Sequence, residues 1–127
     1  MELWPEQAPG SVINLIQLAK DKFFDNKVFH RVVPNFVVQG GCPRGDGYGS
    51  LDYSIRSELV PFSYDTAGIL GMASAGNHTE GTQFFITHNA ALHLDGRYTI
   101  FGKVLQGMDV VDAIQVGDRI TDVKILF

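Results

Sequence analysis

The chain has 127 residues, of which 45% are hydrophobic and 19% charged, a balance that predicts one ordinary soluble globular domain over residues 1–127. Its net charge of −4 disfavours nucleic acid as the main partner, because nucleic acids are usually bound by a basic face. No apolar run approaches the roughly 18 residues that span a bilayer, and the single cysteine, Cys42, excludes an internal disulfide.

The predicted elements, in chain order, are short strands and two helices. Glu2–Trp4 is expected to end a strand, and Pro9–Phe23 to form a helix, because apolar residues recur there at helical spacing and proline suits a first turn. Further strands are predicted at Val28–Val33, Phe36–Gln39, Asp52–Ser57, Ile69–Ala73, Gln83–Thr87, Tyr98–Val104 and Ile120–Phe127, and a second helix at Met108–Gln115. A glycine-rich loop is predicted at Gly40–Gly49, and its stretch from Gly45 to Ser50 is expected to be a flexible lid or a turn. This pattern predicts a mainly β, antiparallel α+β fold, a β-barrel capped at its ends.

Two segments combine strand-forming residues with polar ones that a half-buried strand does not need. In FHRVVPNFVVQGG, which begins at Phe29, Arg31 and Gln39 lie among valines and phenylalanines. Burying either group is costly unless hydrogen bonds satisfy it, so we expect both to line a groove. In GTQFFITH, Phe84 and Phe85 are adjacent and must point to opposite faces of a strand. One ring can then serve the core and the other a site.

Four motifs in this order, FHRVVPNFVVQGG, GILGMASAG, GTQFFITH and LDGRYTIFGKV, resemble the cyclophilin family of peptidyl-prolyl cis-trans isomerases. The resemblance runs from about Glu2 to the C-terminus. It implies a closed antiparallel β-barrel capped by two helices. It also implies an isomerase that rotates X–Pro bonds in proline-containing peptides and unfolded proteins, assists their folding, and uses no cofactor or metal.

Arg31 is the expected catalytic residue. A peptide C–N bond resists rotation by about 18–20 kcal/mol, because the nitrogen lone pair is delocalised into the carbonyl. A fixed guanidinium that donates to the prolyl nitrogen holds the lone pair there and favours the twisted state without proton transfer; the resemblance gives Arg31 this role. It also implies that the substrate-binding residues are His30, Phe36, Val37, Gln39, Ala73, Ser74, Gln83, Phe85, His93, Leu94 and Tyr98.

Some positions depart from the family pattern. Val37 and Tyr98 stand where many relatives carry Met and His. At His93 many eukaryotic relatives carry Trp, whose indole N–H binds the drug cyclosporin, so we expect weak cyclosporin binding. Glu80 matches a position near the family's pocket for residues that precede the proline. It is either a solvated charge without a role or a group that favours Lys or Arg in the substrate.

The start of the chain also differs from the family, whose members usually have a full strand and turn before the segment that matches Glu2–Trp4. With that N-terminal strand missing or truncated, the edge of Ile120–Phe127 is expected to recruit a strand from a second copy or from another domain of a longer parent chain. No signal peptide is visible, which favours a cytoplasmic location, but a truncated start leaves the compartment open.

Two other functions compete with isomerisation. A proline-peptide binding module would keep the groove but turn over weakly or not at all, because its truncated barrel would hold Arg31 loosely. A hydrolase or a metal-dependent enzyme would need a GxSxG nucleophile motif or metal-ligand spacing, and the sequence has neither. An assay of cis-to-trans rates on an X–Pro peptide separates the isomerase from the binding module.

Overall fold

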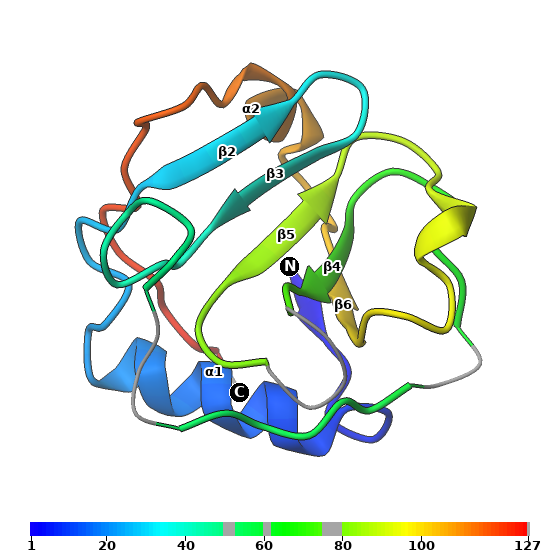
Figure 1. The fold of residues 1–127 in the computed structure, drawn as a ribbon, viewed down its shortest axis with the longest axis horizontal. Coiled ribbons are helices and arrows are strands. Elements are labelled where there is room, and N and C mark those ends of the chain that lie inside the picture. Colours follow the sequence, from blue (N-terminus) through cyan, green and yellow to red (C-terminus); the bar gives the residue numbers. More distant parts are fainter. Residues whose placement is uncertain (50–52, 60–61, 75–79, 127) are drawn as a thin grey trace.

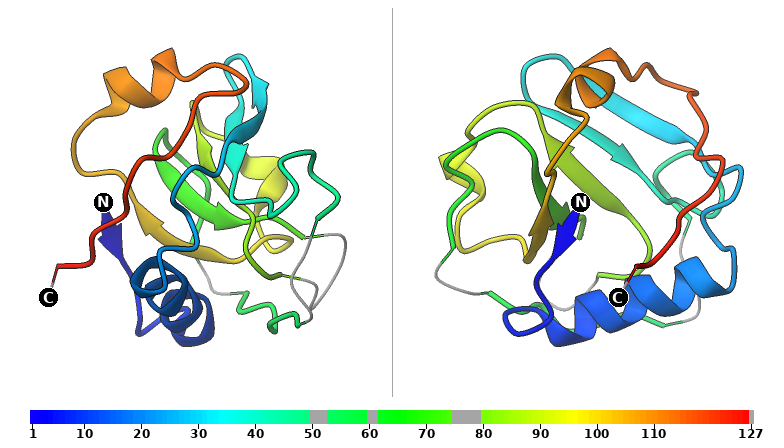
Figure 2. Two further views of the ribbon diagram at one scale, coloured as in Figure 1. Left: turned by 90° about the vertical axis from the view of Figure 1, so that its left-hand side faces the viewer. Right: turned by 180° about the vertical axis from the view of Figure 1, so that it is seen from behind.

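The protein was examined as a computed structural model, which describes residues 1–49, 53–59, 62–74 and 80–126. The elements within these ranges are β1 (Glu2–Leu3), α1 (Pro9–Lys20), β2 (Phe29–Val33), β3 (Val37–Gly40), β4 (Ile69–Met72), β5 (Phe84–Thr87), the 3₁₀ turn η1 (Leu92–Leu94), β6 (Ile100–Lys103) and α2 (Met108–Ala113). The two α-helices lie at opposite ends of the sheet (Figure 1; Figure 2). The predicted mainly β fold with two helices is confirmed.

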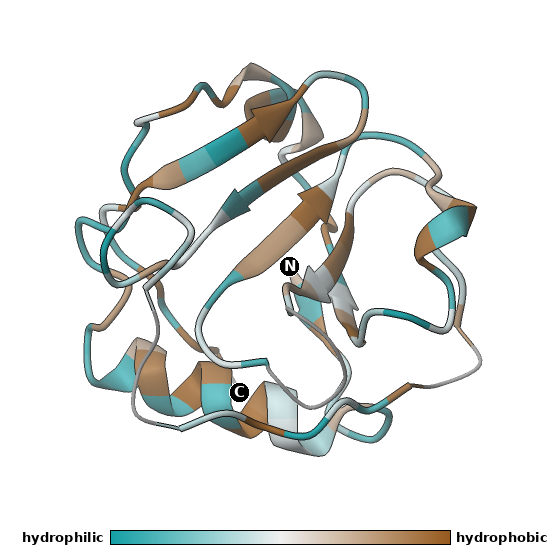
Figure 3. Cartoon of the chain, viewed as in Figure 1, coloured by the Kyte–Doolittle hydropathy of each residue, from teal (hydrophilic) through white to brown (hydrophobic). Residues whose placement is uncertain are grey.

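The strands pair antiparallel in one sheet, in the order β1-β6-β4-β5-β3-β2. Within the described chain the outer strands β1 and β2 form no ladder with each other, so hydrogen bonds do not close the sheet into a complete barrel. Neighbouring residues serve different apolar clusters: Val38 and Ile86 belong to the main core, whereas Val37 and Phe85 belong to a second cluster. β3, β4 and β5 are therefore hydrophobic over most of their length (Figure 3).

Helix α1 takes its N-terminal cap from a residue far along the chain. Ala8, at the N-cap position, provides no side-chain hydrogen bond. The Glu58 carboxylate instead accepts hydrogen bonds from the backbone N–H groups of Gly10 and Ser11, at 2.9 and 2.8 Å. These N–H groups have no acceptor within the helix, and a negative charge is favourable at this end of the helix dipole. Glu58 thus fixes α1 against the rest of the molecule.

Both helices are shorter than the apolar periodicity predicts. The first ends at Lys20 rather than Phe23, because Lys22 adopts the left-handed conformation with φ of 58°. The second ends at Ala113, because Ile114 is already extended. Among the described residues, no helix is long and apolar enough to cross a membrane.

The predicted final strand, Ile120–Phe127, is wrong. Residues 121–126 form no strand, and Phe127 lies outside the described residues. The segment that lies along the edge of β2 comes slightly earlier: the N–H of Phe29 donates to the carbonyl of Asp118 at 2.9 Å, and the N–H of Gly117 donates to the carbonyl of Phe29 at 3.0 Å. The sequence predicted that the chain associates through the exposed edge of this final strand. The described residues do not form that strand, so this edge is absent from them.

The apolar alternation of the same segment nevertheless marks a buried side correctly. Ile120, Val123 and Ile125 pack against a cluster built on Leu18 and Phe24. Alternation reports which side chains face a core, whereas a strand also needs a backbone partner. Within the ranges that the structure describes, the core is present and the partner strand is not.

The predicted strand Asp52–Ser57 is also wrong over its described part. Asp52 lies outside the described residues, and from residue 53 to residue 57 the only sheet-type pairing is an isolated bridge between Ile55 and Glu80.

We expect Glu58→Ala to lower the free energy of unfolding by about 1–2 kcal/mol, because the N–H groups of Gly10 and Ser11 lose their acceptor. Urea unfolding followed by the fluorescence of Trp4, the single tryptophan, measures the change. Glu6→Ala, which removes an exposed carboxylate just before the helix, is the matched control. Equal midpoints for the two variants would show that the cap contributes nothing.

Candidate active site

A groove of about 630 Å³ brings together the predicted site residues, with one exception. It is lined by His30, Arg31, Phe36, Val37, Gln39, Asp46, Gly47, Tyr48, Ala73, Ser74, Phe85, His93, Leu94 and Tyr98. Gln83 is the predicted residue that is absent from this lining. The volume of the groove is in the range of sites for small molecules and short peptide segments.

A β-bulge in β2 directs Arg31 into the groove. Phe29 pairs with Gly40 and Arg31 pairs with Gln39, so His30 is an extra residue without a partner on β3. In a regular strand, residues two apart share a face. The bulge breaks this rule. Arg31 therefore points to the face of the strand opposite to that of Phe29, which packs into the main core.

The strand register then forms a row across the sheet. Arg31 pairs with Gln39, Gln39 with Phe85, and Phe85 with Gly71. A Cβ atom at Gly71 would collide with the ring of Phe85 and with the hydroxyl of Tyr64. Because Gly71 has no side chain, the Phe85 ring can occupy this space. The ring then lies in the same row as the polar side chains of β3 and β2.

Aromatic and aliphatic side chains form one end of the groove. The rings of Phe85 and Tyr98 meet edge to face with centroids 5.9 Å apart, and the imidazole of His93 is tilted against Phe36 at 5.3 Å. Leu94 is buried beside them. Phe84 turns the other way and contacts the core, so the prediction that the two phenylalanines face opposite sides is confirmed. This end can hold a small apolar ring.

Asp95 anchors the turn that carries His93 and Leu94. Its carboxylate accepts hydrogen bonds from the Ser63 hydroxyl at 2.6 Å and from the N–H of Tyr64 at 2.7 Å. These two bonds, the first above all, lower the pKa of Asp95. Burial, with a smaller effect from the charge of Asp95, raises the pKa of Tyr64 far above its usual range. Tyr64 is thus a neutral, fully buried residue that stacks on the ring of Phe85.

Three side chains connect the middle of the groove to the loop beyond β3. Arg31 Nη1 donates to Gln39 Oε1 at 3.4 Å, and Gln39 Nε2 donates to Gln83 Oε1 at 3.0 Å. Gln83 Nε2 in turn donates to the carbonyls of Gly47 and Gly49, at 3.1 and 3.2 Å. Gln83 therefore lies behind the groove and supports Gln39 instead of lining the surface.

His30, the bulge residue, is held neutral next to Arg31. Burial is the main cause that lowers the pKa of His30, and the charge of Arg31 lowers it further, against the opposing effect of Asp46. The buried Nδ1 atom of His30 has no hydrogen-bond partner in the part of the chain that is described. His30 lines the groove without adding a second positive charge at neutral pH.

Residues of the glycine-rich loop line the far end of the groove, which the sequence analysis did not predict. Asp46, Gly47 and Tyr48 contribute there, and Tyr48 is 85% exposed. Asp46 accepts a hydrogen bond from the N–H of Tyr48, which is the main cause of its lowered pKa, and it pairs with Arg44 at 2.8 Å. The loop follows Gln39 and Gly40 directly in the sequence, and this proximity was the available signal.

Glu80 is not the exposed charge that the sequence suggested. It is 1% exposed and absent from the groove lining, and its Oε1 accepts a hydrogen bond from the Ser57 hydroxyl at 2.8 Å. Both alternatives for Glu80, a solvated charge and a group that attracts Lys or Arg, required a carboxylate at the surface. Both are therefore wrong.

The groove offers hydrogen-bond donors rather than a nucleophile. A guanidinium and an amide lie beside an apolar pocket, and no group of three acidic, histidine or cysteine side chains in the described residues is placed to hold a metal ion. Such a site can bind a peptide and stabilise a change in its charge distribution.

Comparisons with known proteins agree with this description. The family described as "Cyclophilin type peptidyl-prolyl cis-trans isomerase/CLD" matches residues 1–126. Peptidyl-prolyl cis-trans isomerase B of Bacillus subtilis is 46% identical over 126 residues, which cover 98% of this chain and 87% of the relative. A peptidyl-prolyl cis-trans isomerase of Synechococcus elongatus is 43% identical, over 99% of this chain and 88% of the relative.

Solved structures of a Cryptosporidium parvum cyclophilin type peptidyl-prolyl cis-trans isomerase share the fold. One has a TM-score of 0.85 at 36% identity and covers 89% of this chain and 74% of that chain. Another, solved in the presence of the dipeptide Ala-Pro, has a TM-score of 0.83 at 36% identity and covers 87% of this chain and 76% of that chain. With the family match along nearly its whole length, the chain belongs to the cyclophilin-type peptidyl-prolyl cis-trans isomerases and has the cyclophilin fold.

Proposed function

We propose that the groove binds the X–Pro segment of peptides and unfolded proteins, and that Arg31 catalyses rotation about the prolyl bond. The observation that carries the proposal is the row across the sheet, in which Gln39 lies between the charged donor Arg31 and the ring of Phe85, with both ends of the row in the groove lining. The relative solved with Ala-Pro supports a proline-containing ligand. Assistance to protein folding follows from this activity, because X–Pro isomerisation can limit the rate of folding.

The proline ring enters the apolar end, where Phe36, Phe85, Leu94 and Tyr98 surround it and Val37 forms part of the lining. Ala73 and Ser74 border the peptide backbone at the edge of the groove. Because these contacts hold the ring, rotation turns the group that precedes the proline. Binding the ring in this way leaves the reacting C–N bond next to Arg31.

Arg31 then donates to the prolyl nitrogen as its lone pair leaves the carbonyl system. The twisted state has a localised lone pair, whereas the planar ground state does not, so this hydrogen bond stabilises the transition state selectively. Gln39 orients the guanidinium through its hydrogen bond to Arg31, and Gln83 holds Gln39 through a second one. The step needs no proton transfer, covalent intermediate or cofactor.

We expect Arg31→Ala to lower kcat/KM by roughly 10²–10³-fold, the loss that follows removal of one preorganised donor. Stability should change little, because Arg31 is exposed. Cis-to-trans rates on a short X–Pro peptide measure the effect, and Arg97→Ala, an exposed arginine outside the groove, is the control.

A rate above half that of the wild type in Arg31→Ala would refute Arg31 as the catalytic group. If the wild-type protein binds the peptide without accelerating its isomerisation, the proline-peptide binding module is the correct alternative.

The pH profile tests the absence of acid–base catalysis. We expect kcat/KM to be constant between about pH 7 and 9, because a guanidinium keeps its proton throughout this range. It should fall only below pH 6.5, the ordinary pKa of histidine from which that of His30 is lowered, because protonated His30 places a second cation beside Arg31.

The sign of the accompanying stability change follows from the same lowered pKa of His30. Well above pH 6.5 the imidazole is neutral in both the folded and the unfolded chain, and the contribution of neutral His30 to stability is present in full. As the pH falls, the unfolded chain binds the proton first and the contribution is lost. His30→Gln should remove the acidic fall in rate and the part of the fall in stability that comes from His30, whereas the lowered pKa values of Asp46 and Asp95 still cause a fall in stability at lower pH. A fall in rate above pH 7 that persists in His30→Gln would indicate a general acid or base.

We further propose that cyclosporin binds this protein weakly through His93. The imidazole is exposed and lies against Phe36, so it presents less apolar area than an indole and lacks the indole's fixed N–H direction. His93→Trp should strengthen binding by about 1–2 kcal/mol, measured by titration calorimetry. Equal affinities for the two proteins would contradict the assignment.

A further inference from the structure

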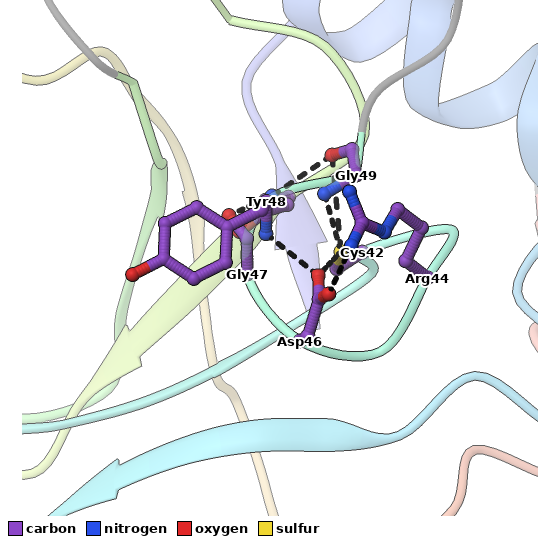
Figure 4. A network of polar contacts seen from close by, with 7 residues as sticks. Cys42, Arg44, Asp46, Gly47, Tyr48 and Gly49 are labelled. Carbon is purple, nitrogen blue, oxygen red and sulfur yellow. Dashed lines mark hydrogen bonds and ion pairs between the residues drawn. The ribbon is translucent and has the colours of Figure 1, made fainter.

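The loop of residues 42–49 is closed at its neck by a sulfur atom. The N–H of Gly49 donates to Cys42 Sγ at 3.2 Å, and Cys42 is fully buried. Within the loop, the N–H of Gly45 donates to the carbonyl of Cys42 at 3.1 Å, and the N–H of Tyr48 donates to Asp46. Figure 4 shows the loop wrapped around the sulfur. These bonds give the loop a defined hydrogen-bonded structure.

The sulfur of Cys42 is well suited to accept hydrogen bonds. Burial raises the pKa of the Cys42 thiol, but the backbone groups of Gly49, Asp46, Arg44 and Gly47 face the sulfur and together lower it more. A buried N–H that loses its acceptor costs free energy, because water cannot replace the bond. The position therefore needs an acceptor atom, and a side chain of similar size without one does not suffice.

Two carbonyls at the end of this loop hold the side chain of Gln83. Because Gly47 and Gly49 accept both hydrogen bonds of one amide group, the direction of that amide depends on the loop. Gln83 in turn accepts from Gln39, which accepts from Arg31. An unbroken series of hydrogen bonds thus connects the neck of the loop to the guanidinium.

The bond at the Arg31 end of the series is the longest, 3.4 Å, and Arg31 itself is exposed. A long exposed side chain has many rotamers, so its orientation depends on the few groups that restrain it. Gln39 is the one side chain that hydrogen-bonds the guanidinium among the described residues. Any freedom gained by Gln83 or by the loop is therefore transmitted to Arg31.

We propose that Cys42 and the loop of residues 42–49 are a positioning device for Arg31, with the sulfur as its anchor. This proposal rests on the proposed catalytic role of Arg31. Loosening the anchor lets the amide of Gln83 turn, releases Gln39 and widens the range of directions in which Arg31 points. Because Arg31 acts on the twisted state, the loss is expressed in kcat, whereas binding of the proline ring at the opposite end of the groove is unaffected.

The first experiment compares Cys42→Ala and Cys42→Ser with the wild type on an X–Pro peptide. Cys42→Ala should lower kcat about 5- to 10-fold and leave KM within about twofold, since a displaced catalytic group loses rate without losing ground-state binding. Cys42→Ser, which restores an acceptor, should recover part of kcat. The control is Val111→Ala, a buried core residue on α2 outside the groove, which lowers stability without touching the loop.

The second experiment is a double-mutant cycle with Gln83→Met, which keeps the length of the side chain and removes its amide. If the series transmits the effect, Cys42→Ala has no further effect on kcat in the Gln83→Met background. Three results would each overturn the proposal. The losses of kcat in Cys42→Ala and Gln83→Met could multiply in the double variant, kcat could be unchanged in Cys42→Ala, or Val111→Ala could lose as much kcat as Cys42→Ala. If the Cys42 variants do not fold, the effects of Gln83→Met on kcat and KM still test the proposal.

A third measurement separates this proposal from the catalytic role of Arg31. The Nε–H signal of Arg31 in an NMR spectrum, assigned by its loss in Arg31→Ala, should shift or broaden in Cys42→Ala and in Gln83→Met but not in Val111→Ala. A normal rate in Arg31→Ala contradicts the proposed catalytic role, even if this signal responds. An Arg31 signal that is unchanged in both Cys42→Ala and Gln83→Met contradicts the positioning, whatever the rate of Arg31→Ala.

Discussion

One unpaired residue in β2 decides which face of the sheet carries the chemistry. Without the bulge at His30, Arg31 would share a face with Phe29 and enter the main core among Val38 and Leu70. An unpaired charge in such a place is far too costly for a folded chain. The bulge solves this conflict, since Phe29 and Val32 both pack inward while Arg31 between them points to the groove. The row through Gln39 and on to the ring pocket depends on this geometry.

The middle of the groove combines one exposed charge, Arg31, with neutral groups, whereas the charged Asp46 belongs to the loop at the far end. Arg31 is exposed to water, so it carries less of the desolvation cost that a buried cation would. Its neighbours Gln39 and Gln83 are uncharged amides, and burial keeps His30 neutral. A guanidinium in these surroundings has no carboxylate as a direct partner in the described residues, which leaves its donors available to a peptide.

The sequence predicted the fold and the middle of the groove well, because both follow from local patterns. Adjacent Phe84 and Phe85 cannot share a face of a strand, and Arg31 and Gln39 are poor core residues, so their placement follows from alternation and the cost of burial. The resemblance to a known family added the residues of the apolar end.

Features that depend on partners far along the chain were not predictable in this way. The bulge at His30 is a matter of register against β3, which no single strand reveals. Glu80 looks like a surface charge until the fold brings Ser57 to it. The segment after Ile120 has the alternation of a strand, but no strand lies beside it in the described chain. In each case a long-range contact outweighs the local preference.

The pairing of β1 with β6 bears on how the chain is assembled during synthesis. Glu2 pairs with Lys103, so β1 waits until β6 has been made before it finds its partner strand. The cap of α1 by Glu58 spans a further 48 residues from Gly10. Contacts so distant in sequence slow folding, since a long loop must close before they form. On the ribosome, β2 and β3 can pair as soon as both are made, but the other edge of β3 waits for β5, and β1 and one edge of β4 wait for β6. An isomerase of this design is therefore itself exposed to premature aggregation before it can assist other chains.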